Sequence, residues 1–179
     1  ALRTLHYNRV DENGNWGEPD NFGTLSNPVQ FIAASDHDNN VIVAATFVVP
    51  FGSTDTSLSY ARFDAEAGDW VGPFSLESEG LDVEDHSLTV DASGNAMVVW
   101  DQRREGSFDG DMITVEDPET LWTRRYNAST EEWEDAEILN DVLPGVIDRL
   151  SVDITTSGEV VAGWFYEDGP LVTINARLF

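Results

Sequence analysis

One segment of the chain, residues 103–119, gathers side chains whose types and spacing could bind a metal ion. Five acidic residues lie close together in it: Asp109, Asp111, Glu116, Asp117 and Glu119. Carboxylate oxygens are the ligands that Ca²⁺ prefers, and the Gly between the first two aspartates permits a tight turn. The segment does not contain a complete EF-hand loop. Two interpretations therefore stay open, a calcium site and a solvated acidic loop.

The same segment offers contacts for an organic ligand. Arg103 and Arg104 stand at its start, and Phe108 follows them. A guanidinium group binds carboxylates through paired hydrogen bonds, and an aromatic face can stack on a sugar ring. Trp122 lies just beyond the segment and outside the repeat described below, where it could line a sugar-binding surface; packing in the core is the alternative. These four residues are our candidate ligand contacts.

The elements that must position these residues follow from an internal repeat. One kind of segment is a strand, a turn and a tryptophan, and it occurs at 7–16, 60–70 and 123–133. An arginine recurs at one position of these copies and again near the C-terminus: Arg9, Arg62, Arg125 and Arg177. The period is about 53 residues, with one insertion of about ten residues in the third copy. The insertion contains the acidic segment, and extra length on one repeat is typical of a functional loop.

A second kind of segment alternates with the first, at 32–47, 88–100 and 153–164. Each copy has a turn followed by a short apolar run rich in Val and Ile, which favours a strand over a helix. Asn39, Gly94 and Gly158 mark the turns and can adopt the positive φ that tight turns need.

The repeat predicts an all-β chain in which each period forms four antiparallel strands. We expect thirteen strands in units of about 1–28, 29–80, 81–141 and 142–179, and we expect strand even in 128–141, whose composition is helical. Four-stranded units at this period are typical of β-propeller blades, and a β-sandwich is the alternative. About three periods are too few for a closed ring. We therefore expect a fragment or half of a propeller, or two chains that combine into a ring of about six blades.

The turn segments resemble the Asp-box hairpins of sialidase-type propellers, with Asp64, Gly68 and Trp70 as the clearest copy. In the third copy, Asn127 and Thr130 stand in place of the Asp and the Gly. The chain also resembles bacterial secreted repeats through a second set of residues: Asp91, Gly94, Asn95, Val98 and Trp100. The resemblance implies a propeller in which the aspartate braces its hairpin and the tryptophan packs between blades. Sialidases bind a carboxylate with three arginines, but recurrence at one blade position favours a bracing role for the repeated arginines.

The charge of the chain limits its partners. It has 9 Lys and Arg against 34 Asp and Glu, for a net charge of −25, and it has no Cys. We therefore expect neither a nucleic-acid partner nor an anionic membrane surface, because both would be repelled. Adaptation to high salt, calcium binding and compositional drift remain three explanations of the acidity. No apolar run is long enough to span a membrane as a helix.

Together these features predict a secreted or cell-surface module that binds carbohydrate or a protein, or that serves a structural role, with Ca²⁺ ordering its loops. The alternative is part of a sialidase-like glycoside hydrolase. The sequence identifies no catalytic residue, and we lean towards a protein that is not an enzyme. A second copy of the chain, or further blades of a longer chain, are the expected structural partners.

Overall fold

The computed structural model describes most of the chain, and the statements below concern that part. The described residues are 6–10, 13–21, 28–48, 56–77, 82–102, 120–140, 146–155, 157–168 and 170–179. They contain fourteen strands and no helix, so the predicted all-β fold is confirmed. With no helix in these ranges, none could cross a membrane.

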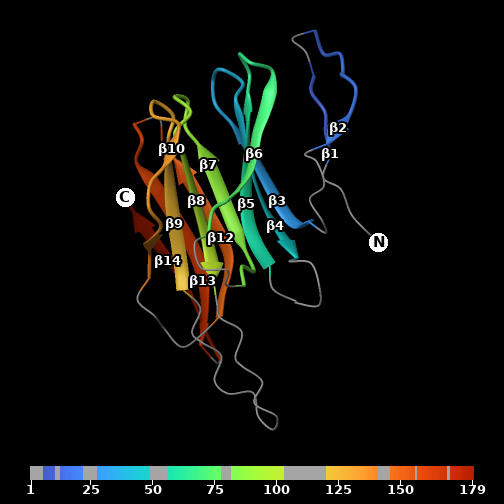
Figure 1. Cartoon of the computed structure of the whole chain (residues 1–179). Coiled ribbons are helices and arrows are strands. Elements are labelled where there is room, and N and C mark those ends of the chain that lie inside the picture. The colour runs from blue at the N-terminus through green and yellow to red at the C-terminus, as the bar shows by residue number, and fades with distance from the viewer. Residues whose placement is uncertain are drawn as a thin grey trace.

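The strands form four antiparallel sheets that follow one another along the chain (Figure 1). Sheet 1 is a hairpin of β1 (His6–Tyr7) and β2 (Asp20–Asn21). Sheet 2 contains β3 (Pro28–Ser35), β4 (Val41–Val48), β5 (Thr56–Asp64) and β6 (Asp69–Ser75). Sheet 3 contains β7 (His86–Val90), β8 (Ala96–Gln102), β9 (Thr120–Asn127), β10 (Glu132–Trp133) and β11 (Glu137–Ile138). Sheet 4 contains β12 (Val146–Ile154), β13 (Val160–Asp168) and β14 (Leu171–Leu178).

Within each large sheet, neighbouring strands are consecutive in sequence, except that β11 pairs with β9 in sheet 3. Sheet 2 has the order β3-β4-β5-β6, and sheet 4 has the order β12-β13-β14. The first strands of the sheets lie beside one another, because β7 contacts both β3 and β12. Consecutive meanders are typical of propeller blades, and the β-sandwich stays the alternative. We call β3, β7 and β12 the inner strands.

Two hydrophobic cores hold the large sheets together. Core A lies between sheets 2 and 3, and core B lies between sheets 3 and 4. Strand β8 contributes to both cores, since Val98 and Trp100 belong to core A and Met97 and Val99 to core B. All seven residues of β8 are buried. A strand covered on both faces has a continuous apolar run instead of strict alternation, and this explains the uninterrupted apolar segments of the repeat.

The turns confirm most of the predicted repeat. Asn39, Gly94 and Gly158 have φ values of 67°, 85° and 84°, so the expected residues occupy the left-handed region. One assignment was wrong. Glu131, at φ 58°, occupies the turn position of Gly68 in the third copy, and Thr130 does not. The hydrogen bonds show this register, because the Glu134 nitrogen bonds the Arg125 oxygen just as Gly17 bonds Arg9 in the first copy.

The last strand of the third unit also differs from expectation. The described part of the segment 128–141, residues 128–140, contains no helix, as predicted, but it forms two short strands, β10 and β11, and both pair with β9. The residues between them are not in strand, so the described residues contain fourteen strands where thirteen were expected.

Candidate functional site

The acidic segment and most of the candidate contacts lie outside the described residues. This holds for the following residues: Arg103, Arg104, Phe108, Asp109, Asp111, Glu116, Asp117 and Glu119. Strand β8 ends at Gln102 and β9 begins at Thr120, and these two residues are paired. The segment therefore connects the end of β8 to the start of β9, at the edge of sheet 3 where β7 begins. Within the described ranges, no cluster of three or more His, Asp or Glu side chains could hold a metal ion.

Trp122 lies on β9 and packs against core A. Its ring is stacked against Trp100, with centroids 6.5 Å apart and an interplanar angle of 15°. Its Nε1 atom is buried and has no hydrogen-bond partner among the described residues. The structure thus places this candidate contact within a stacked pair beside the core.

A carboxylate that lies just before β7 accepts hydrogen bonds from the other two inner strands. One oxygen of Asp85, Oδ1, accepts hydrogen bonds from Gln30 Nε2 at 2.8 Å and from the His86 nitrogen at 2.8 Å. The other oxygen, Oδ2, accepts from the Leu150 nitrogen at 3.0 Å. Gln30 belongs to β3 and Leu150 to β12, so a single side chain links sheets 2, 3 and 4. We call this region the inner-strand end.

Two buried groups hold Asp85 in place. Asp101, which is 1% exposed, accepts hydrogen bonds at Oδ1 from the Glu84 and Asp85 nitrogens. His86 is 3% exposed, and its Nε2 lies 3.2 Å from the Ala44 oxygen. Burial lowers the pKa of His86, although the Ala44 carbonyl and Asp85 act in the opposite direction. A neutral imidazole that donates from Nε2 fits this environment.

Arg149 stands next to this bridge in a strained conformation. Its φ is 56°, and the pairing of β12 with β13 shifts register between Asp148 and Ser151, which marks a β-bulge. The side chain is exposed, and its Cζ lies 5.6 Å from the centre of the Phe165 ring. A residue other than Gly in this region costs about 1–3 kcal/mol and persists only where its surroundings enforce it. The bond from Leu150 to Asp85 supplies such a constraint.

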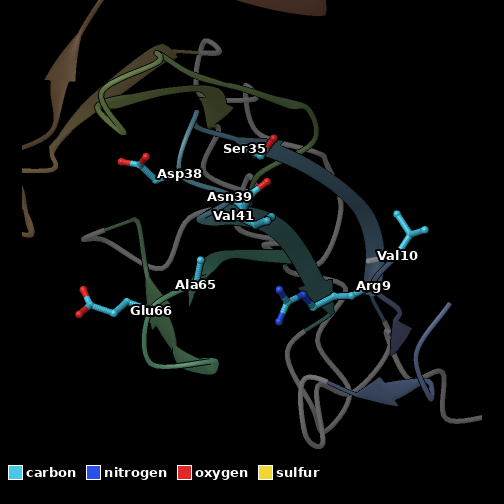
Figure 2. A pocket seen from close by; sticks show the side chains of 8 residues that line it. All are labelled: Arg9, Val10, Ser35, Asp38, Asn39, Val41, Ala65 and Glu66. Carbon is cyan, nitrogen blue, oxygen red and sulfur yellow. The ribbon is translucent and has the colours of Figure 1, made fainter. Parts of the chain in front are cut away.

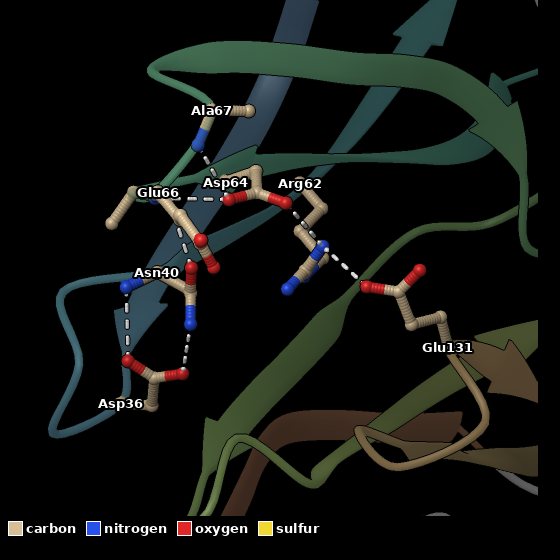
Figure 3. Close-up of polar contacts among 8 residues, drawn as sticks. Asp36, Asn40, Arg62, Asp64, Glu66, Ala67 and Glu131 are labelled. Carbon is tan, nitrogen blue, oxygen red and sulfur yellow. Dashed lines mark hydrogen bonds and ion pairs between the residues drawn. The ribbon is translucent and has the colours of Figure 1, made fainter.

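The repeated arginines do not converge on one site. Arg9 lies over the Phe63 ring at 4.4 Å, and Arg62 Nη1 lies 3.3 Å from Glu131 Oε1 and 3.6 Å from Asp64 Oδ2. Arg177 Nη1 donates to the Leu139 oxygen at 2.7 Å. Each of these arginines therefore reaches from its own sheet to the neighbouring one. Figure 3 shows Arg62 between the turn of its own sheet and Glu131 of the next.

The acidic turns at the opposite end of the sheets satisfy their own polar groups. Asp36 accepts hydrogen bonds from the Asn40 nitrogen at 2.9 Å and from Asn40 Nδ2 at 2.7 Å, and Asn40 Oδ1 accepts from the Ala65 nitrogen (Figure 3). Asp91 and Asn95 repeat this arrangement in sheet 3. The Asp and Asn of the repeat therefore join the two turns of one sheet, and we call this the turn end.

A groove of about 860 Å³ lies at the turn end, between sheet 1 and sheet 2. Arg9 and Val10 line it from sheet 1, and the two turns of sheet 2 line its other side (Figure 2). The turns contribute a mixed polar and apolar set: Ser35, Asp38, Asn39, Val41, Ala65 and Glu66. The hairpin and the turns of sheet 2 are therefore not in close contact across this groove.

Sequence reasoning missed Arg149 and Asp85. Arg149 lies at no repeat position, and no residue type identifies an arginine that will adopt a left-handed backbone. Asp85 precedes β7 in an acid-rich stretch, so only its three hydrogen bonds distinguish it from its neighbours. The two residues are nevertheless connected in space, because Asp85 bonds the backbone of Leu150, the residue that follows Arg149.

Comparison with known proteins supports the fold. No family model and no curated protein sequence matches the chain. A solved structure described as a new family of polysaccharide lyase, the PL25 ulvan lyase, matches with a TM-score of 0.66 and 16% identity, over 99% of this chain and 48% of that chain. A second ulvan lyase structure, bound to -[GlcA(1-4)Rha3S]-, matches with a TM-score of 0.64 and 16% identity, over 97% and 46%. These neighbours have a β-propeller-like fold, and the chain spans about half their length. At this identity the likeness shows the fold alone.

Proposed function

We propose that the chain is a segment of a secreted or cell-surface β-propeller that binds a polysaccharide at the inner-strand end, with Arg149 as a ligand contact. The observation that carries the proposal is the left-handed backbone of the exposed residue Arg149 at a bulge. Bulges re-aim side chains and are frequent beside functional sites. Strained residues of this kind cluster where ligands are held.

The chemistry of the region suits a saccharide. A planar guanidinium presents five donors, which can bind hydroxyl, carboxylate or sulfate oxygens in pairs. Glu84, which precedes Asp85, is exposed and can accept hydrogen bonds from sugar hydroxyls. The fold likeness to polysaccharide lyases, one of them solved with a saccharide, supports a polysaccharide over a protein ligand.

The acidic segment 103–119 has a place in this proposal. It connects β8 to β9 at the end of sheet 3 where β7 begins, close to the strand start that Asp85 precedes. We propose that Ca²⁺, bound through carboxylates of Asp109, Asp111, Glu116, Asp117 or Glu119, orders this segment beside the polysaccharide. Arg103, Arg104 and Phe108 would then extend the same binding surface.

The proposal is tested by calorimetric titration of the chain with a panel of neutral and acidic polysaccharides. Arg149→Gln should weaken binding at least tenfold, which corresponds to about 1.4 kcal/mol. Arg149→Gly should weaken it equally while the backbone strain is relieved, so that thermal stability is retained or raised. Arg125→Gln is the matched control, because Arg125 lines a cleft at the turn end with Asp91 and Asn127.

Two results would count against the proposal. One is a wild-type chain that binds none of the polysaccharides while a protein ligand is found. The other is an Arg149→Gln variant with the wild-type melting temperature and the wild-type affinity, which would place the binding site elsewhere.

A further inference from the structure

The saccharide contact proposed at Arg149 has acidic residues on two sides, and the segment before β7 supplies the first of them. The Oδ2 atom of Asp85 accepts a hydrogen bond from the Leu150 nitrogen at 3.0 Å, so this carboxylate lies against the backbone next to Arg149. Glu84 precedes Asp85 and is exposed. Its backbone nitrogen donates to Oδ1 of the buried Asp101 at 3.1 Å, which fixes this part of the chain. The segment therefore brings negative charge to the inner-strand end.

Sheet 4 adds a carboxylate on the face that Arg149 approaches. The Cζ atom of Arg149 lies 5.6 Å from the centre of the Phe165 ring. Glu167 follows two residues later in β13, so it points to the same face as Phe165, and it is exposed. It pairs with Val146, the first residue of β12, which places it at the inner-strand end. The guanidinium thus approaches a face that carries both an aromatic ring and a carboxylate.

The hydrogen-bonding capacity of these groups fits sugar hydroxyls. An ionised carboxylate only accepts hydrogen bonds, and a guanidinium only donates them. A hydroxyl can do both, so it can donate to Glu84 or Glu167 and accept from Arg149. The carboxylate of a uronic acid and the sulfate of a sulfated sugar only accept, so they match Arg149 alone. Beside the two glutamates they would face a second acceptor of the same charge.

The charge of the whole chain acts in the same direction. The net charge is −25, so an anionic polymer approaches through a repulsive potential. The screening length is about 10 Å at 0.1 M salt and about 3 Å at 1 M, so this repulsion is strong in dilute buffer and weak in molar salt. Like charges brought together at a binding surface suppress the wrong partner. An uncharged polymer does not meet this barrier.

We propose that the inner-strand end selects uncharged polysaccharides, and that Glu84 and Glu167 exclude polymers that carry carboxylates or sulfates. The inference rests on the proposed function, because it names the class of polysaccharide that Arg149 contacts. The guanidinium donates to the oxygens of a hydroxyl-rich chain, and the two carboxylates accept hydrogen bonds from its hydroxyls. Molar salt relieves the exclusion, so acidic polymers should bind only there.

The test compares acidic polysaccharides with their carboxyl-reduced forms, in which each carboxylate has become a CH2OH group. Alginate and polygalacturonate provide two such pairs, since reduction removes the charge and leaves the linkages intact. Both members of a pair are titrated calorimetrically in the same buffer, first without and then with molar salt. The reduced form should bind at least about tenfold more tightly in dilute buffer, and the difference should fall below about threefold in molar salt.

Charge variants assign the exclusion to the two glutamates. Glu84→Gln combined with Glu167→Gln should narrow the difference between the two members of a pair at least about threefold in dilute buffer, because two like charges are removed from the site. Glu66→Gln combined with Glu132→Gln is the matched control. It removes the same charge from exposed residues at the turn end, and it should narrow the difference by less than about twofold. Circular dichroism melts establish that both double variants are folded.

Three results would overturn the inference. The first is an acidic polysaccharide that binds in dilute buffer at least as tightly as its reduced form. The second is a difference within a pair that molar salt leaves unchanged. The third is a control variant that narrows the difference as much as Glu84→Gln with Glu167→Gln does. Each of these leaves a polysaccharide site in place, whereas a chain that binds no polysaccharide of either kind refutes the proposed function and this inference together.

Discussion

The turns of consecutive sheets touch at Gly94, and this contact yields a quantitative prediction. A Cβ atom at Gly94 would lie 3.0 Å from Asp36 Oδ2 of sheet 2 and 3.2 Å from the Ala128 Cβ of sheet 3. Asp36 cannot turn away freely, because Asn40 and the Asp38 nitrogen bond its carboxylate. Gly94→Ala should therefore force the turns of sheets 2 and 3 apart.

Gly158 provides a matched control for the backbone. It occupies the same turn position in sheet 4 with φ 84°, against 85° for Gly94, but a Cβ atom at Gly158 would meet no atom within 4 Å beyond its chain neighbours. Alanine at such a φ costs about 1–2 kcal/mol, and the loss of unfolded-state freedom returns about 0.4–1 kcal/mol. Overpacking adds about 1–3 kcal/mol at Gly94 alone. We expect Gly158→Ala to lose about 1 kcal/mol and Gly94→Ala about 2–4 kcal/mol.

The assay is urea unfolding followed by tryptophan fluorescence, at one fixed salt concentration. Thermal melts give a second estimate, because about 1 kcal/mol shifts the melting temperature of a chain of this size by about 2–4 °C. If the two variants lose the same stability within about 0.5 kcal/mol, the contact between the turns contributes nothing, and the reasoning is refuted.

Three further predictions concern protons, calcium and salt. Burial lowers the pKa of His86 below its ordinary value of 6.5, so the unfolded chain binds this proton more readily than the folded chain. The free energy of unfolding should therefore fall as the pH drops below 6.5, by at most about 1.4 kcal/mol per pH unit. His86→Asn should reduce the difference between the urea midpoints at pH 7 and pH 5.5. An unchanged difference would mean that other groups cause the pH dependence. Calcium should raise the melting temperature relative to chelator, and Asp109→Asn with Asp111→Asn should remove the increase, whereas identical melts in calcium and chelator would dismiss the site. If the acidity reflects adaptation to salt, the melting temperature should rise between dilute and molar salt, and a constant value would exclude that explanation.

The strands and turns were predictable because they repeat. Packed sheets need the same apolar run and the same turn in each copy, so Gly94 and Gly158 could be recognised from their register alone. The third copy has no Gly in this turn, so residue type does not mark its left-handed position, and the prediction of Thr130 was wrong. Only the hydrogen bonds of the turn place it at Glu131.

The inner-strand end was not predictable for a related reason. Asp85 acts through hydrogen bonds to three sheets, and the partners of such a residue are fixed by tertiary packing, not by sequence spacing. Arg149 departs from the repeat, and a bulge leaves no mark in residue type. Trp122 was recognised as lying outside the repeat, but its stacking on Trp100 depends on the pairing of β8 with β9.

The most direct test of the central proposal is hydrogen exchange measured by mass spectrometry with and without a bound polysaccharide. The account predicts protection of backbone amides at residues 82–87 and 146–152, with no change at the turn end around residues 36–40 and 91–95. Protection confined to the turn end, with the inner-strand end unaffected, would contradict it.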